Sequence, residues 1–120
     1  MTIAYWIVAG LAALVFLAAG AMKLARPKEA LQASGMGWVE DFSASNVKLI
    51  GIAEVLGAIG LILPMLTGIA PILSPIAGAA LALLMVGAAI THIRRNEPPI
   101  PFALVLLAAA TAVLGFLVLA

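Results

Sequence analysis

The sequence contains no cysteine, and this absence excludes several kinds of chemistry. Disulfides, thiol catalysis, cysteine-ligated zinc and iron–sulfur clusters all need a sulfur that the chain does not carry. It has one histidine, His92, so a single copy cannot supply two histidine ligands to a haem. We therefore expect no metal site and no covalent cofactor. Any redox role must take its electron carrier from a quinone, another ligand or a partner protein.

Charged residues are also scarce. Only 9% of the 120 residues are charged, whereas 66% are hydrophobic. A soluble domain of this size could not hide so much apolar surface, whereas lipid solvates an apolar exterior. The formal net charge of +1 does not provide the basic face that nucleic-acid binding needs. The composition therefore predicts an integral membrane protein that contacts the lipid bilayer and binds no nucleic acid.

The hydrophobic residues fall into four long apolar runs. Each run is near the ~20 residues that cross a ~30 Å hydrocarbon core as a helix. The apolar–polar alternation of membrane-spanning strands is absent, so the runs are predicted to be helices. We predict an all-α fold, an integral membrane four-helix bundle that forms a single domain over residues 1–120. Its spans are expected at about residues 3–22, 49–66, 71–91 and 101–120.

The basic residues predict the orientation of these spans. All six lysines and arginines lie in or beside the first and third connections, and the second connection and both tails have none. The positive-inside rule places those two connections in the cytoplasm. We therefore expect a multi-pass protein of the inner (plasma) membrane with both termini outside the cytoplasm. Tyr5, Trp6 and Trp38 are interpreted as aromatic anchors at the two membrane interfaces.

Glu54 is the most informative residue, because it lies inside the second apolar run. Counted from a helix start near Asn46, it is roughly 12 Å deep. A bare carboxylate at that depth costs several kcal/mol, so Glu54 must be protonated, paired or facing a wet cavity. Intramembrane ionisable groups are functional candidates by default, and the alternative is a structural ion pair.

Two other polar residues are expected at the same depth. Lys23, at the end of the first span, can reach Glu54, although snorkelling to the headgroups needs no partner. His92, at the end of the third span, can relay a proton or donate a hydrogen bond, or as a cation stabilise a helix C-terminus. Lys48 is closer to the interface and is expected to snorkel. We predict that Lys23, Glu54 and His92 form a ligand-binding or polar cluster, and we assign no catalytic residue.

Three sequence blocks suggest a family. They are GAMKL at residues 20–24, GIAEVLGAIGLILP at residues 51–64, and MVGA at residues 85–88 followed by His92 and two arginines. In this order they resemble the DoxX-like family of small four-helix membrane proteins, over essentially the whole chain. The resemblance implies the fold. Some members of the wider family are membrane subunits of thiosulfate:quinone oxidoreductase, others are linked to oxidative-stress complexes at the membrane, and distant relatives are membrane chaperones or cargo receptors.

Three functions remain open. The first is an accessory subunit of a membrane redox (quinone-linked) system, with other redox subunits as partners and a small apolar molecule bound near Glu54. The second is a scaffold or chaperone for another membrane protein, in which the polar cluster only fixes the bundle. The third, ranked last, is a small proton-coupled exporter, because small multidrug transporters carry their glutamate among aromatics in the first span. The sequence leaves enzymatic activity open and is compatible with a monomer or an oligomer.

Overall fold

The computed structural model describes residues 1–33, 35–98 and 100–120, and in these ranges the chain is helical with no strand. Four long helices, each apolar enough to cross a bilayer, confirm the expected all-α membrane bundle. They are α1 (Thr2–Ala25), α3 (Ala44–Thr67), α4 (Leu73–Arg94) and α5 (Pro101–Leu119). The connection between α1 and α3 adds a short helix, α2 (Lys28–Ala33), and a 3-10 helix, η1 (Gly37–Asp41).

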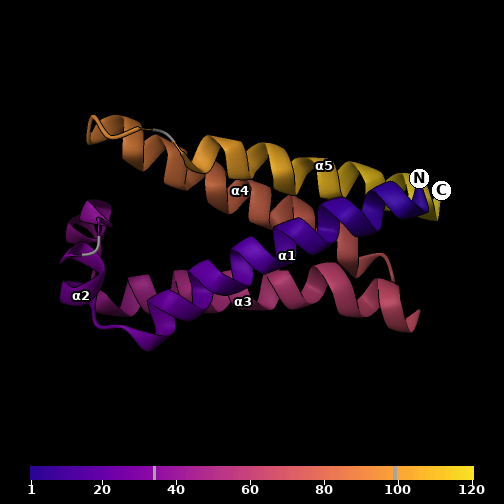
Figure 1. The fold of residues 1–120 in the computed structure, drawn as a ribbon, viewed down its shortest axis with the longest axis horizontal. Helices are drawn as coiled ribbons and strands as arrows, with labels where there is room; N and C mark the ends of the chain where they lie inside the picture. The colour runs from indigo at the N-terminus through magenta and orange to yellow at the C-terminus, as the bar shows by residue number, and fades with distance from the viewer. Residues whose placement is uncertain (34, 99) are drawn as a thin grey trace.

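The helices run lengthwise with both chain termini at one end (Figure 1). We call this the terminal end. The opposite end, which holds α2, η1 and the α4–α5 connection, is the cap end. Helices α4 and α5 stay side by side, whereas α1 runs diagonally from α5 at the terminal end to α3 at the cap end (Figure 1). Residues 28–33 and 35–42 of the α1–α3 connection are called the cap.

Side chains from all four long helices form the bundle interior. Phe16 of α1, Leu61 of α3 and Leu81 of α4 are almost completely buried. Large hydrophobic side chains are also exposed along every long helix, as expected where lipid is the solvent. Small residues let the helices approach closely: a Cβ added to Gly78 of α4 would lie 3.0 Å from the Ala112 backbone nitrogen. Such close backbone contact stabilises helix pairs where water provides no hydrophobic driving force.

A buried polar network holds the terminal end together. The fully buried Tyr5 donates its hydroxyl proton to the Leu61 carbonyl oxygen over 2.6 Å. Ser74 of α4 accepts a hydrogen bond from the Met65 backbone N–H over 3.1 Å. Both contacts lie beside Pro64, which has no N–H and interrupts the hydrogen-bond ladder of α3. Neighbouring helices supply polar partners at such breaks in membrane proteins. The interpretation of Tyr5 as an interfacial anchor is therefore wrong, because its ring lies in the core.

Lys48 joins the beginning of α3 to the end of α1. Its ammonium group donates to the carbonyl oxygens of Lys23, Leu24 and Arg26 at 2.7, 2.9 and 2.8 Å. An ammonium group has three donors, so these bonds use all of them. Its positive charge also lies at the C-terminus of α1, where the helix dipole favours a cation. Lys48 thus caps α1, a role that the sequence did not predict.

We expect Lys48→Met to lower the free energy of unfolding by about 2 kcal/mol, since hydrogen bonds to charged groups contribute on the order of 1.5–3 kcal/mol. Thermal melting in detergent measures this loss, and amide hydrogen exchange should rise at residues 23–26. Lys28→Met, on α2, is the matched control and should have little effect. Equal melting of the two variants would show that the three bonds do not stabilise the protein.

Candidate functional site

Helices α1 and α3 touch at two glycines near the cap end. A Cβ on Gly20 would lie 2.7 Å from the Gly51 carbonyl oxygen and 2.7 Å from Val55 Cγ2. A Cβ on Gly51 would lie 2.9 Å from Lys23 Cβ and 3.0 Å from the Gly20 carbonyl oxygen. Neither position can carry a side chain unless backbone or side-chain atoms move. The two glycines therefore set the distance between the helices.

Lys23 and Glu54 each follow one of these glycines by three residues, so each lies on the same helix face as its glycine. Lys23 Nζ is 2.6 Å from Glu54 Oε1, and the two side chains are only 7% and 1% exposed. Because α3 begins at Ala44, Glu54 lies about 15 Å along the helix from its start. The structure thus brings together two of the three residues of the predicted cluster as a buried ion pair.

An aromatic side chain of the cap covers this ion pair. Lys23 Nζ lies 5.6 Å from the centre of the Trp38 ring, in the range of a cation–π contact. Trp38 in turn packs edge-on against Phe42, with ring centres 5.6 Å apart. Trp38 was interpreted from the sequence as an interfacial anchor, and its position beside the ion pair was missed. The available signal was two aromatic residues in a mostly polar connection, but the sequence does not show that this connection folds over the bundle.

A cavity of about 540 Å³ lies next to the ion pair at the cap end. Lys23, Glu54, Thr91 and His92 provide polar groups on its wall, and Trp38 and Phe42 provide aromatic faces. The rest of the wall is largely aliphatic or small, including Ala19, Ile50, Leu84, Met85, Ala88 and Leu104. All four long helices and the cap contribute to it. Ligand pockets in proteins commonly have this size and this combination of apolar walls with a few polar groups.

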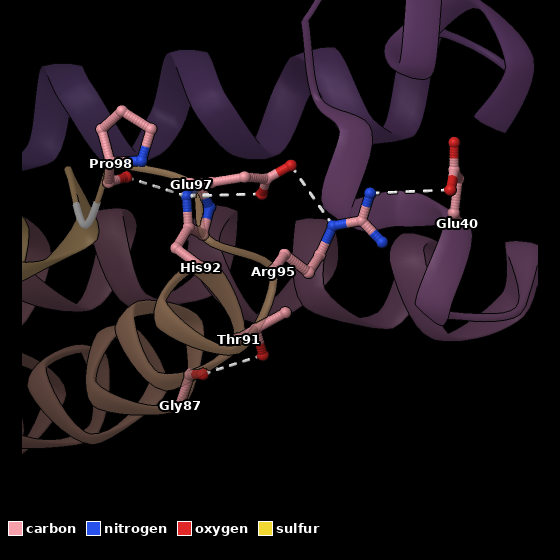
Figure 2. A network of polar contacts seen from close by, with 7 residues as sticks. All are labelled: Glu40, Gly87, Thr91, His92, Arg95, Glu97 and Pro98. Carbon is pink, nitrogen blue, oxygen red and sulfur yellow. Dashed lines mark hydrogen bonds and ion pairs between the residues drawn. The ribbon is translucent and has the colours of Figure 1, made fainter.

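His92 lies on the wall of the same cavity, but the α4–α5 connection holds its ring (Figure 2). His92 Nδ1 is 3.1 Å from the Pro98 carbonyl oxygen, which can only accept, so Nδ1 carries the proton and donates. Nδ1 also lies 3.8 Å from Glu97 Oε1. This bond leaves Nε2 as the ring nitrogen for a ligand. The third predicted residue therefore faces the cavity region from a separate network and is not bonded into the Lys23–Glu54 pair.

A second hollow, of about 740 Å³, lies between α1 and α3. It is lined by apolar and small residues such as Gly10, Leu14, Ile59 and Leu63. Several of these side chains are exposed on the surface that meets lipid. Since its lining offers no polar side chain to orient a ligand, we place the candidate site in the cavity beside Glu54.

Fold and site together define a multi-pass membrane protein with a ligand-sized cavity beside a buried acid–base pair. The chain matches the DoxX-like family over residues 7–114 and belongs to that family. The matched range contains Lys23, Glu54 and His92. Comparison with curated proteins and with solved structures finds no match.

Proposed function

We propose that this DoxX-like protein is an accessory subunit of a membrane redox (quinone-linked) system and holds a small apolar molecule near Glu54. The observation that carries the proposal is the cavity of about 540 Å³, which is apolar over most of its wall and polar beside the buried Lys23–Glu54 pair. Such a site suits a ligand with an apolar body and one polar head. Quinones have this combination of an apolar tail and a polar ring.

The wall chemistry fits both redox forms of a quinone. The oxidised form presents carbonyl oxygens, which can accept from the Lys23 ammonium group, and the hydroxyl groups of the reduced form can donate to the free Nε2 of His92. The reduced form presents hydroxyl groups, which can donate to the Glu54 carboxylate. Trp38 and Phe42 offer aromatic faces on which a flat ring can pack. The partners proposed on this basis are other redox subunits of the same membrane.

A scaffold or chaperone role is the second candidate, and the observation that favours it is also the ion pair. Lys23 and Glu54 tie α1 to α3, so they can be explained by bundle stability alone. The scaffold role requires no small molecule in the cavity. Ligand binding therefore separates the two proposals.

Binding can be followed through Trp38, because Trp6→Phe leaves it as the single tryptophan of the chain. We expect decylubiquinone to quench its fluorescence saturably in detergent or nanodiscs. Glu54→Gln and His92→Ala should each weaken binding by roughly tenfold, which corresponds to about 1.4 kcal/mol. Leu14→Ala, in the second hollow, is the control and should leave binding unchanged.

Circular dichroism should show that both variants remain helical. Unchanged binding in Glu54→Gln and His92→Ala would leave the cluster with a structural role only. Absence of saturable quenching in the parent protein would move the preference to the scaffold function.

The proposed location is the plasma membrane, with the cap end in the cytoplasm. The structure gathers all six lysines and arginines at that end, and the positive-inside rule makes it the inner side. Because the chain has no cysteine, a single introduced cysteine reports one position. With a membrane-impermeant maleimide on intact cells, cysteines at Thr2 and Ala120 should label and one at Asn96 should not. Labelling of Asn96 alone would reverse the orientation.

A further inference from the structure

A polar network joins the cap to the α4–α5 connection (Figure 2). Arg95, just after α4, places Nη2 3.5 Å from Glu40 Oε2 of η1. The same guanidinium donates through Nε to Glu97 Oε2 over 3.2 Å. Arg95 therefore contacts Glu97 of its own connection and Glu40 of the cap.

Gly37 of the cap allows close packing against this network. A Cβ on Gly37 would lie 3.0 Å from Glu97 Oε2 and 3.4 Å from Arg95 Nη2, so the glycine lets η1 pack directly against the charged pair. On the other side, the Gln32 side-chain amide of α2 donates to Glu40. Glu40 is thus held from within the cap while it contacts Arg95 of the α4–α5 connection. We call this boundary between η1 and residues 95–98 the seam.

The seam borders the cavity. Met36, Trp38 and Phe42 of the cap form one part of the cavity wall. His92 near the end of α4 and Ile100 of the α4–α5 connection form another part. Arg95 links the segments that carry these two parts. Movement of the cap away from α4 and α5 would open the cavity at this seam.

We propose that the Arg95–Glu40 contact is a latch that holds the cap over the cavity and regulates access of the ligand. This inference rests on the proposed function, because it assigns a regulation to the same site. The latch is weak because Glu40 is 50% exposed. Exposed ion pairs shift a conformational equilibrium, here between closed and open cap, by no more than about fivefold. Salt screens such pairs, so ionic strength changes the fraction of open cap.

Access to the cavity can be measured without any ligand. In the Trp6→Phe background, acrylamide quenching reports how readily a small neutral solute reaches Trp38, the cap residue that lines the cavity. We expect Arg95→Gln to raise the quenching constant about two- to fivefold at low salt. Glu40→Gln should act in the same direction. The double variant should raise quenching by less than the sum of the two single effects, because both changes break the Arg95–Glu40 contact, although Arg95→Gln also removes the bond to Glu97.

Two controls remove the same charges elsewhere. Arg94→Gln neutralises the neighbouring exposed arginine, and Glu29→Gln neutralises an exposed carboxylate of α2. In both variants the acrylamide quenching constant of Trp38 should equal that of the parent protein. About 1 M salt, where the Debye length is about 3 Å, should raise quenching in the parent and in both controls but not in Arg95→Gln.

Equal quenching in Arg95→Gln, Glu40→Gln and the controls would overturn the latch. Strictly additive effects of the two latch variants would also contradict it. Should Arg95→Gln lose helical structure, Glu40→Gln alone decides, since its side chain is half exposed and its removal leaves the α4–α5 connection intact. A higher quenching constant in Arg95→Gln and Glu40→Gln, together with no decylubiquinone binding in the parent or any variant, would support the latch and reject the proposed function.

Discussion

Replacing Gly20 by alanine is expected to lower the free energy of unfolding by about 2–3 kcal/mol, the upper part of the roughly 1–3 kcal/mol found for overpacked interiors. The added methyl would meet a backbone oxygen of α3 at 2.7 Å, and backbone cannot rotate away as a flexible side chain can. The helices must separate instead. Intrinsic helix propensity alone gives the opposite sign, since alanine stabilises a helix by about 1 kcal/mol relative to glycine.

Gly10→Ala is the matched control for this prediction. Gly10 lies on the same helix, and a Cβ there would meet no atom within 4 Å. This variant should melt at or above the temperature of the parent, whereas Gly51→Ala should be destabilised in the same sense as Gly20→Ala. Thermal melting in detergent measures all three. Equal melting of Gly20→Ala and Gly10→Ala would show that the α1–α3 contact does not fix the bundle.

Breaking the buried ion pair is the second change with a large expected effect. Lys23→Met leaves the Glu54 carboxylate without its cation, and Glu54→Gln leaves the Lys23 ammonium group without its anion. Removing one partner of a buried pair costs on the order of 3–5 kcal/mol in soluble proteins, because the remaining charge stays in a low-dielectric environment. We expect a loss of at least about 2 kcal/mol in each variant, measured by unfolding in detergent.

The double variant Lys23→Met/Glu54→Gln tests whether the residues act as a pair. It should recover part of the loss, with a coupling energy of about 1 kcal/mol or more. Lys28→Met and Glu29→Gln, on α2, provide a matched cycle that should show small and additive effects. Additive losses at Lys23 and Glu54 would mean that the 2.6 Å contact is not a stabilising pair.

The sequence predicted the helices well because length and hydrophobicity alone decide a membrane span. The predicted spans at 3–22 and 101–120 lie close to α1 and α5. Helix α3 begins at Ala44, slightly before the predicted helix start near Asn46 and before the predicted apolar span at residue 49, since Ser43 caps it by accepting from the Asn46 N–H. Because the first turn of α3 contains polar residues, hydrophobicity alone does not show where the helix begins.

The Lys23–Glu54 pair was also predictable, because both residues had to lie at a similar depth inside an apolar bundle. Depth does not give the direction in which a side chain points. That is why His92 could be placed at the cap end but its bond to the Pro98 carbonyl could not. The glycine before each member of the pair was visible in the sequence, whereas its contact with the facing helix required the structure.

The contacts of three residues could not be predicted, because their partners lie far away in the sequence. Tyr5 bonds to Leu61, Lys48 bonds to the end of α1, and Trp38 covers Lys23. Each is an amphipathic side chain for which an interface position is the usual expectation. Each instead places its polar atom or its aromatic face against a specific group in the bundle.

In the proposed latch, the site has a fixed part and a movable part. Close backbone packing and a buried ion pair hold α1 against α3. The cap packs on α3 through the buried Leu31 and Val39, whereas an exposed ion pair joins it to the α4–α5 connection. Binding elements that move are drawn from the less stable parts of proteins. In such a site the rigid Lys23–Glu54 pair can keep a ligand oriented, and movement of the cap can let the ligand exchange.

The central claim is that the cavity beside Glu54 holds a small apolar molecule with a polar head. Mass spectrometry of gently purified protein tests it most directly, by comparing the small molecules that accompany the parent and the Glu54→Gln variant. We expect a quinone-class molecule with the parent and a large loss of it from the variant, while circular dichroism shows both to be helical. Equal retention by the two proteins, or a parent that carries only lipid or a stoichiometric protein partner, would contradict the claim.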